Sequence, residues 1–275
     1  MFSLRAPGTS AASFSCAAFD LDGTLYFGDT LAEGAADLLD AVARTGATVI
    51  FFTNNSMKTR DAVVGKLVGM GLPASRSNTY TSGSAVGGYL VERGIRTVAL
   101  VGSEGLAEEL AAAGVSVTDE GGDAEALIVG LIPGFDFSSP PGILGGLPDD
   151  IPLIAANMDM TYPVEVDRLR PGCGAIVRAV EGWMGRPADS VVGKPGTFML
   201  DLLCAEHGVR RGEVLVVGDS LDSDIAMARA AGCHSVLIDS AGNAGEVGDT
   251  VVVRDLRELR SLLSGPGGHR EGSRS

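Results

Sequence analysis

The sequence of 275 residues has only four cysteines, and no two of them form a Cys-X-X-Cys pair. Such scattered thiols argue against a disulfide framework or a zinc site, and they favour reduced, buried side chains. No apolar run approaches the roughly 20 residues that a membrane-spanning helix needs. Residues 1–15 contain one arginine and no sustained apolar segment, so we expect no signal peptide and a cytoplasmic location.

Positive charge is also scarce. The chain has 21 lysines and arginines against 35 aspartates and glutamates, and its formal net charge is −14. An acidic surface argues against general binding of nucleic acids or of anionic membranes, and we predict neither as a partner. Any site for an anion must therefore be made positive locally, by a metal ion, a lysine or backbone N–H groups.

Aromatic residues make up only 5% of the chain, but apolar residues make up 45%, enough for an ample core in one large or two modest domains. Short apolar runs alternate with stretches of helical periodicity, which is typical of βαβ units. We predict strands at residues 15–19, 48–52, 214–217, 235–238 and 250–253, and helices at 33–44, 59–70 and 223–231. The strands are apolar on both faces, which predicts an α/β fold with a Rossmann-like parallel sheet core.

The middle of the chain repeats this alternation on a smaller scale. It has predicted strands at residues 97–101, 126–129 and 153–156, and a helix at 105–113. We therefore predict a smaller α/β cap domain at 82–186, inserted into a core domain of residues 1–81 and 187–264. Residues 265–275 are mostly glycine, serine and charged residues with nothing to bury, and we predict a disordered tail.

Three predicted strands of the core end in reactive side chains. Asp20, Thr53 and Asp219 each follow an apolar run directly. The carboxyl ends of parallel strands meet at one edge of a sheet, so these residues are expected to lie together. Asp22 lies two residues beyond Asp20, and Asp224 lies five residues beyond Asp219, near the start of a predicted helix.

Several carboxylates at one edge repel each other, and a hard divalent cation with oxygen ligands would resolve that conflict. Mg²⁺ suits such a site when it also holds phosphate and water. Asp20 could then attack phosphorus, while Asp22 protonates the leaving alcohol and later deprotonates water. Lys194, Thr53 and the backbone amide of Asn54 would bind the phosphate oxygens.

Each of these segments is weak evidence when taken alone. A lone Asp-X-Asp-Gly is often a surface turn, and Thr-Asn-Asn-Ser at residues 53–56 can be a turn with a helix N-cap. Gly-Lys-Pro at residues 193–195 is usually a loop, and Gly-Asp pairs at strand ends are common. All four segments occur here in order, each at a predicted strand end or in an adjoining loop. Together they indicate a phosphoryl-transfer site.

The four segments, at residues 20–24, 53–56, 193–195 and 218–225, resemble the motifs of the haloacid dehalogenase superfamily. Asp22 resembles the second aspartate of its phosphatases rather than its dehalogenases. The long insertion before the third segment is similar to the type-two cap of the nitrophenyl-phosphatase branch. That branch includes phosphatases of pyridoxal phosphate, phosphoglycolate, glycerol phosphate and nucleotides. The resemblance extends from about residue 16 to residue 239.

This resemblance implies a Mg²⁺-dependent phosphatase that hydrolyses a small-molecule phosphate ester. Asp20 would be the nucleophile and a metal ligand. Asp22 would be the acid and base, with its backbone carbonyl on the metal. Asp219 would be a further metal ligand, and Asp224 would support the metal site.

The resemblance also implies a set of residues that bind the substrate. Thr53, Asn54 and Lys194 would bind phosphate. Asn157 belongs to a segment that reads Ala-Asn-Met-Asp at residues 156–159, where many relatives have Thr-Asn-Pro-Asp. Tyr162 corresponds to a position that often touches the substrate, although packing against the cap is an equal alternative for a tyrosine.

Two other functions fit the same fold. One is a phosphotransferase or phosphomutase, although those enzymes usually have a different cap. The other is a catalytically idle binding protein. The intact set of Asp20, Asp22, Lys194 and Asp219 argues against it. The physiological substrate stays open. So does the oligomeric state, because caps of this type form homodimers in some relatives and not in others.

Overall fold

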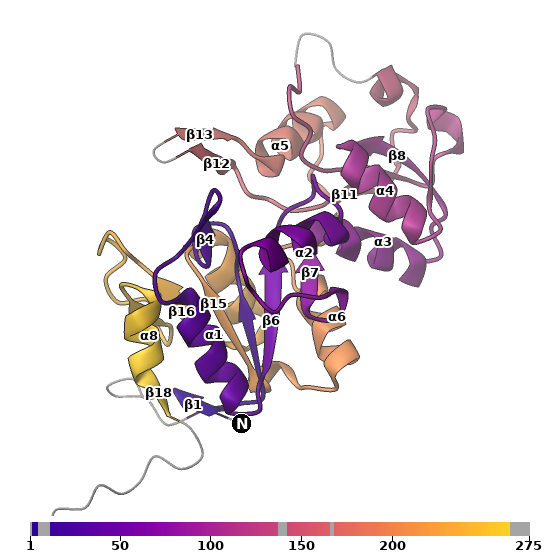
Figure 1. The fold of residues 1–275 in the computed structure, drawn as a ribbon. Helices are drawn as coiled ribbons and strands as arrows, with labels where there is room; N and C mark the ends of the chain where they lie inside the picture. The colour runs from indigo at the N-terminus through magenta and orange to yellow at the C-terminus, as the bar shows by residue number, and fades with distance from the viewer. Residues whose placement is uncertain (1, 5–11, 137–141, 166–167, 265–275) are drawn as a thin grey trace, which may run out of the picture.

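The computed structural model describes residues 2–4, 12–136, 142–165 and 168–264. The tail predicted to be disordered, residues 265–275, lies outside the described residues. The described chain forms two α/β bodies, and each is built on its own parallel sheet (Figure 1). This arrangement confirms the predicted core sheet with a smaller inserted α/β unit.

The larger sheet has six parallel strands in the order β17-β16-β15-β3-β6-β7. Its strands are β3 (Cys16–Phe19), β6 (Thr48–Thr53), β7 (Thr79–Thr81), β15 (Val214–Gly218), β16 (His234–Ile238) and β17 (Val251–Val253). Strand β3 is central, because it pairs with both β6 and β15. The predicted strands are therefore confirmed, and β7 is an additional one.

Helices cover both faces of this sheet. They are α1 (Ala35–Arg44), α2 (Arg60–Gly69), α3 (Ser82–Glu92), α6 (Phe198–His207), α7 (Ala226–Ala231) and α8 (Leu256–Leu262). Successive strand residues face opposite sides, so Ala17 and Phe19 pack with α1, α2 and α8. Cys16 and Ala18 pack with α3, α6 and α7. This double burial explains why the strands are apolar at consecutive positions.

The smaller sheet has five parallel strands in the order β14-β11-β10-β8-β9. It comprises β8 (Thr97–Val101), β9 (Ser116–Val117), β10 (Ala126–Val129), β11 (Leu153–Ala155) and β14 (Ser190–Val191), with helices α4 (Glu104–Ala112) and α5 (Cys173–Met184). We call this body the cap. The domain boundaries at 82 and 186 stay a prediction, and β14 lies a few residues beyond the second one.

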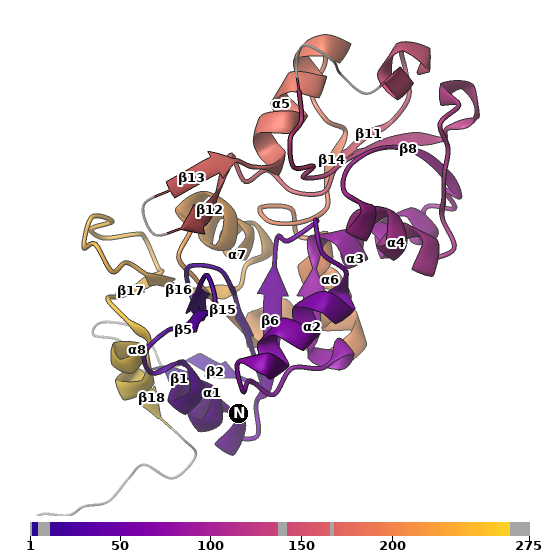
Figure 2. The same cartoon turned by 45° about the horizontal axis from the view of Figure 1, so that its top comes forward.

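Two short hairpins lie where the two bodies meet (Figure 2). One belongs to the core and is formed by β4 (Tyr26–Phe27) and β5 (Thr30–Leu31). The other belongs to the cap and is formed by β12 (Thr161–Glu165) and β13 (Arg168–Pro171). The remaining elements are a small sheet of β1 (Phe2–Leu4), β2 (Ala12–Phe14) and β18 (Leu263–Ser264), and 3₁₀ turns at Arg76–Asn78, Gly121–Asp123, Gly142–Gly146 and Arg211–Glu213.

One predicted helix differs in the structure. Residues Leu221–Ile225 form a π-helical turn, and the regular helix α7 begins only at Ala226. The turn contains Asp224, whose carboxylate is directed inward onto Lys194. Wider turns of this kind are frequent at functional sites, because they re-aim a side chain. Among the described helices, none combines the length and the apolar character that spanning a bilayer requires.

Candidate active site

A cavity of about 570 Å³ lies between the carboxyl edge of the larger sheet and the cap. Its floor comes from the ends of β3, β6 and β15, and its roof from the segment that leads into β12. All the residues predicted as site residues line this cavity: Asp20, Asp22, Thr53, Asn54, Asn157, Tyr162, Lys194, Asp219 and Asp224. The fold thus brings together side chains that are up to about two hundred positions apart.

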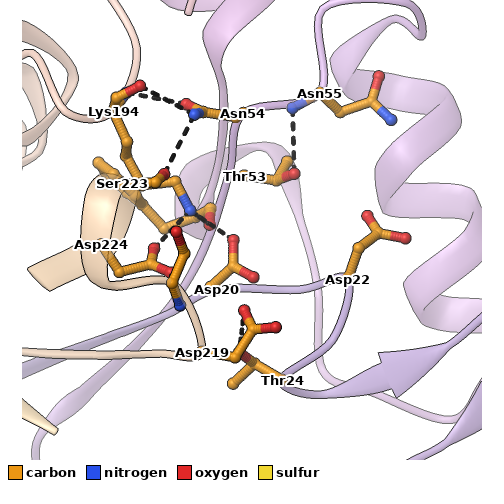
Figure 3. Close-up of polar contacts among 12 residues, drawn as sticks. Asp20, Asp22, Thr24, Thr53, Asn54, Asn55, Lys194, Asp219, Ser223 and Asp224 are labelled. Atoms are coloured by element: carbon orange, nitrogen blue, oxygen red, sulfur yellow. Dashed lines mark hydrogen bonds and ion pairs between the residues drawn. The ribbon is translucent and has the colours of Figure 1, made fainter. Parts of the chain in front are cut away.

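Lys194 is the central cation of the cavity floor. Its Nζ forms ion pairs with the carboxylate of Asp20 and with Oδ1 of Asp224, the latter at 2.6 Å (Figure 3). All three residues are buried. Burial alone would lower the pKa of Lys194, but the two aspartates outweigh it and raise that pKa, so the lysine stays charged.

Three carboxylates lie close together around this lysine. Asp20, Asp219 and Asp224 can each offer an oxygen within 4.8 Å of the others. Burial raises the pKa of Asp20 well above its ordinary value, and Asp224 and Asp219 add to the effect while Lys194 opposes it. Loss of solvation and the charge of Asp224 raise the pKa of Asp219 to about 6. One lysine is therefore not enough to compensate three carboxylates.

Two glycines allow this close approach. A Cβ atom on Gly23 would lie 2.3 Å from Oδ2 of Asp219, and Gly23 has a left-handed φ of +91°. A Cβ atom on Gly218 would lie 2.2 Å from Cγ of Asp224. Gly23 thus allows the left-handed turn after Asp22 and also leaves room for the carboxylate of Asp219.

Thr53 is oriented by its own loop. Its Oγ1 accepts a hydrogen bond from the backbone N–H of Asn55 at 3.1 Å (Figure 3). Because the hydroxyl oxygen already accepts, its proton remains available for an anion in the cavity. This geometry is compatible with the predicted phosphate-binding role.

The side chain of Asn54 is occupied by the protein itself. Its Oδ1 accepts from the backbone N–H of Lys194 at 2.8 Å, and its Nδ2 donates to the carbonyl of Lys194 at 2.9 Å. The same Nδ2 also lies 3.0 Å from Oδ2 of Asp159 and 3.3 Å from Oγ of Ser223. The amide of Asn54 therefore fixes the loop of Lys194. A phosphate contact of the Asn54 backbone N–H stays a prediction.

Asn157 joins the cap to the loop that contains Asn54. Its Nδ2 donates to the carbonyl of Asn54 at 2.7 Å, and its Oδ1 accepts from the N–H of Asp159 at 3.1 Å. Its side chain is buried. Tyr162, in β12, is half-buried and lines the cavity from the cap side. Contact of either residue with a substrate stays a prediction.

Comparison with known proteins gives the family. Residues 17–116 match the family model described as haloacid dehalogenase-like hydrolase, and residues 191–259 match one described as HAD-hydrolase-like. Chronophin of Mus musculus is 30% identical, over 88% of this chain and 86% of its own. Glycerol-3-phosphate phosphatase of Homo sapiens is 32% identical, over 80% of this chain and 77% of its own. The chain belongs to the haloacid dehalogenase-like hydrolases.

Solved structures of this hydrolase family agree with the assignment. The p-nitrophenyl phosphatase from Archaeoglobus fulgidus superposes with a TM-score of 0.81 at 27% identity. The match covers 90% of this chain and 99% of that chain, so it includes both the core and the cap. The chain is therefore a phosphatase, a phosphoric monoester hydrolase of this family with a type-two cap.

The acidic cluster of this hydrolase fits a metal ion. Its donors are hard carboxylate oxygens, which suit Mg²⁺ or Ca²⁺ better than softer metals. Burial is the main cause of the raised pKa values of Asp20 and Asp219, and repulsion from the neighbouring carboxylates adds to it. A bound cation would relieve that repulsion. The side chain of Asp22 is not part of the cluster, and it extends away from Asp20 (Figure 3).

Several residues of this hydrolase site have contacts that the sequence does not predict. Asp159 and Ser223 bind the amide of Asn54, and Tyr26 contacts Asp22. Asp159 and Ser223 were visible only as parts of motif segments. The contact of Tyr26 depends on a short hairpin, for which the sequence offers no clear periodicity.

Proposed function

We propose that this phosphatase hydrolyses the phosphomonoester of a small metabolite through an aspartyl-phosphate on Asp20, with Mg²⁺ in the acidic cluster. The observation that carries the proposal is the position of Asp20 on the floor of the cavity, between Lys194 and the carboxylate of Asp219. Lys194 contacts Oδ1 of Asp20. The other carboxylate oxygen has no hydrogen-bond partner among the described residues and is the candidate nucleophile.

The reaction takes place in two displacements. In the first, Asp20 attacks phosphorus, the bond from phosphorus to the ester oxygen breaks, and Asp22 gives a proton to the leaving alkoxide. In the second, water attacks the phosphorus of the aspartyl-phosphate, Asp22 takes a proton from that water, and inorganic phosphate leaves. Asp20 and Asp22 are restored at the end, so the net reaction is hydrolysis.

The metal would be held by Asp20, Asp219 and the backbone carbonyl of Asp22, with Asp224 in support. Asp224 also binds Lys194 and accepts from the N–H of Ser220 at 3.2 Å. When bound, Mg²⁺ would neutralise charge on the phosphoryl group and on the carboxylates, which lets an anionic nucleophile approach an anionic ester.

The phosphoryl oxygens would be bound by Lys194, the hydroxyl of Thr53 and the backbone amide of Asn54. Positioning and charge stabilisation of this kind are most of what phosphoryl transfer requires from a protein. Asn157 would act through the loop of Asn54, and Tyr162 would contact the remainder of the substrate. The cavity of about 570 Å³ suits a small metabolite rather than a macromolecule.

The test is release of inorganic phosphate from p-nitrophenyl phosphate and from a panel of metabolite phosphates, with Mg²⁺ and with a chelator. We expect activity that depends on Mg²⁺, and at least about a thousandfold loss in Asp20→Asn. Asp40→Asn, an exposed aspartate on α1, is the matched control and should retain activity. Full activity of Asp20→Asn, or activity in the presence of the chelator, would contradict the proposal.

Two further expectations belong to the same proposal. A homodimer formed through the cap is tested by light scattering of the purified protein, and a monomer mass would rule it out. The cytoplasmic location is tested by fractionation of the cells that produce the protein.

A further inference from the structure

The turn between Asp20 and the core hairpin β4–β5 holds Tyr26 at the active site. The backbone N–H of Gly23 donates to the carbonyl of Tyr26 at 2.9 Å, and the N–H of Tyr26 donates to the carbonyl of Leu21 at 3.2 Å. These bonds close a tight turn at residues 21–26, directly after Asp20. As a result, Tyr26 lies beside Asp22, four positions earlier in the chain, and both residues line the cavity.

The hydroxyl of Tyr26 donates a hydrogen bond to Oδ2 of Asp22 at 2.9 Å. Within the described part of the chain, this is the only hydrogen bond that the Asp22 side chain makes. Asp22 itself is exposed, so without this contact its carboxylate would be free to change rotamer. Figure 3 shows this carboxylate apart from the ion pairs of Asp20, Lys194 and Asp224.

The ring of Tyr26 is held firmly enough to act as an anchor. Only 3% of the residue is exposed. The ammonium of Lys66 lies 3.9 Å from the ring centroid, and it also donates to the carbonyl of Gly28 at 2.8 Å. Packing on the buried side and a cation over one ring face fix the phenol in place. Because the Tyr26 hydroxyl is fixed, its hydrogen bond determines the direction in which the Asp22 carboxylate points.

We propose that Tyr26 is a positioning residue for proton transfer by Asp22. Its hydroxyl engages Oδ2, which leaves Oδ1 as the oxygen that carries the proton. In the first displacement this proton moves from Oδ1 to the leaving alkoxide, and in the second Oδ1 receives one from water. Tyr26 keeps its own proton throughout. The inference depends on the role proposed for Asp22 in the preceding subsection.

The test compares two esters that differ in their need for an acid. The p-nitrophenolate ion leaves readily without protonation. The alkoxide released from glycerol 3-phosphate is much more basic and needs a proton to leave. We expect Tyr26→Phe to lower kcat/KM for glycerol 3-phosphate by about 10- to 100-fold, the effect of one hydrogen bond to a charged group. For p-nitrophenyl phosphate we expect a change of less than about threefold, because kcat/KM reports the steps up to the departure of the first product.

The control is Tyr89→Phe, which removes the same atom from a buried tyrosine outside the cavity. Tyr89 donates to Oγ of Ser190 at 2.6 Å. This variant should leave both kcat/KM values unchanged. An equal loss for the two esters in Tyr26→Phe, or no loss for either, would overturn the inference, since a general structural defect does not distinguish leaving groups.

A double variant separates this inference from the proposed function. If Tyr26 acts only through Asp22, then Asp22→Asn with Tyr26→Phe should be no slower on glycerol 3-phosphate than Asp22→Asn alone. A further loss in the double variant would overturn the positioning role while the role of Asp22 stands. Normal activity of Asp22→Asn would contradict the acid assignment and, with it, the inference. Absence of phosphate release by the unmodified protein would contradict the proposed function itself.

Discussion

Lys194 lies between two aspartates, and this arrangement determines how much negative charge the site carries before a cation binds. Asp20 and Asp224 contact the lysine directly, and an oxygen of Asp219 lies within 4.8 Å of theirs. With all three carboxylates ionised, the cluster is left with two uncompensated negative charges, which a divalent cation balances. Protons compete for the same charge when the cation is absent, as the raised pKa of Asp219 indicates.

This competition predicts that stabilisation by Mg²⁺ depends on pH. The pKa of Asp219 is raised to about 6, so this carboxylate is ionised above that value and protonated below it. A bound proton must leave before the carboxylate can bind metal. We therefore expect the rise in Tm caused by Mg²⁺ to be large at pH 7 and to diminish as the pH falls through about 6. Thermal melts with and without Mg²⁺ at several pH values measure it.

The control for this pH dependence is Asp219→Asn, which should show little rise in Tm with Mg²⁺ at any pH. An undiminished rise at a pH well below 6 in the unmodified protein would contradict the prediction. Comparing melts with and without Mg²⁺ at the same pH removes the contribution of carboxylates elsewhere on the surface.

A second prediction at this scale concerns Gly23. Gly23→Ala should lose metal-dependent activity, because the added Cβ would lie 2.3 Å from Oδ2 of Asp219. The substitution should also lower the free energy of unfolding by about 1 kcal/mol or more, because alanine is strained at a left-handed φ. Gly71→Ala is a matched control, with a similar φ of +81° and no atom within 4 Å of the added Cβ. It should lose stability but retain activity. Equal activity in the two variants would show that the contact with Asp219 does not matter.

At the scale of elements, the long buried strands of the two sheets could be predicted, whereas the short strands such as β4, β7 and β14 and several helices could not. Buried parallel strands such as β3 and β15 have short, continuous apolar runs, because both faces are covered. Helix α3 contains three glycines and two serines in eleven residues, so its intrinsic helix propensity is poor. It is stabilised instead by a capping box at Thr81 and by burial of its apolar side chains between the core and the cap. Such tertiary support is not visible in a local pattern.

The same distinction applies to the site. Asp20, Thr53 and Asp219 could be placed together, because strand ends in a parallel sheet share an edge. The contacts of Asn54 with Asp159 and Ser223 could not be predicted, since they join segments more than a hundred positions apart and depend on side-chain direction. Motif order is therefore informative about which residues gather, but not about which of them face the ligand.

The N-terminus of the core helix α2 receives a hydrogen-bond acceptor from the cap, and we expect this contact to stabilise the fold. The backbone N–H of Arg60, at the start of α2, donates to Oε1 of Glu109 from the cap helix α4. Glu109 is buried, and its negative charge is favourable at a helix N-terminus. We expect Glu109→Gln to lower the free energy of unfolding by about 1–2 kcal/mol. Chemical denaturation measures it, and Glu108→Gln, an exposed neighbour, should have no effect of that size.

At the scale of the whole molecule, the cap and the core share one hydrophobic core. A single cluster of buried residues contains Ile50 and Phe52 of the larger sheet together with Leu127 and Ile154 of the smaller one. Polar contacts add to it, since the N–H of Leu131 in the cap donates to Oγ of Ser56 in the core at 3.1 Å. Two bodies joined in this way are expected to depend on each other for stability.

This shared core predicts that the cap and the core unfold together. Trp183, in the cap helix α5, is the only tryptophan and reports on the cap by fluorescence. Far-UV circular dichroism reports on both bodies, and we expect the two signals to have the same denaturation midpoint. The double variant Trp183→Phe, Phe27→Trp moves the fluorescent probe to the core hairpin. Phe27 is exposed, so a tryptophan fits there, and we expect the fluorescence and circular dichroism midpoints to coincide again. A cap signal that is lost at lower denaturant than the core signal would contradict the prediction, and would mean that the cap opens while the phosphatase core stays folded.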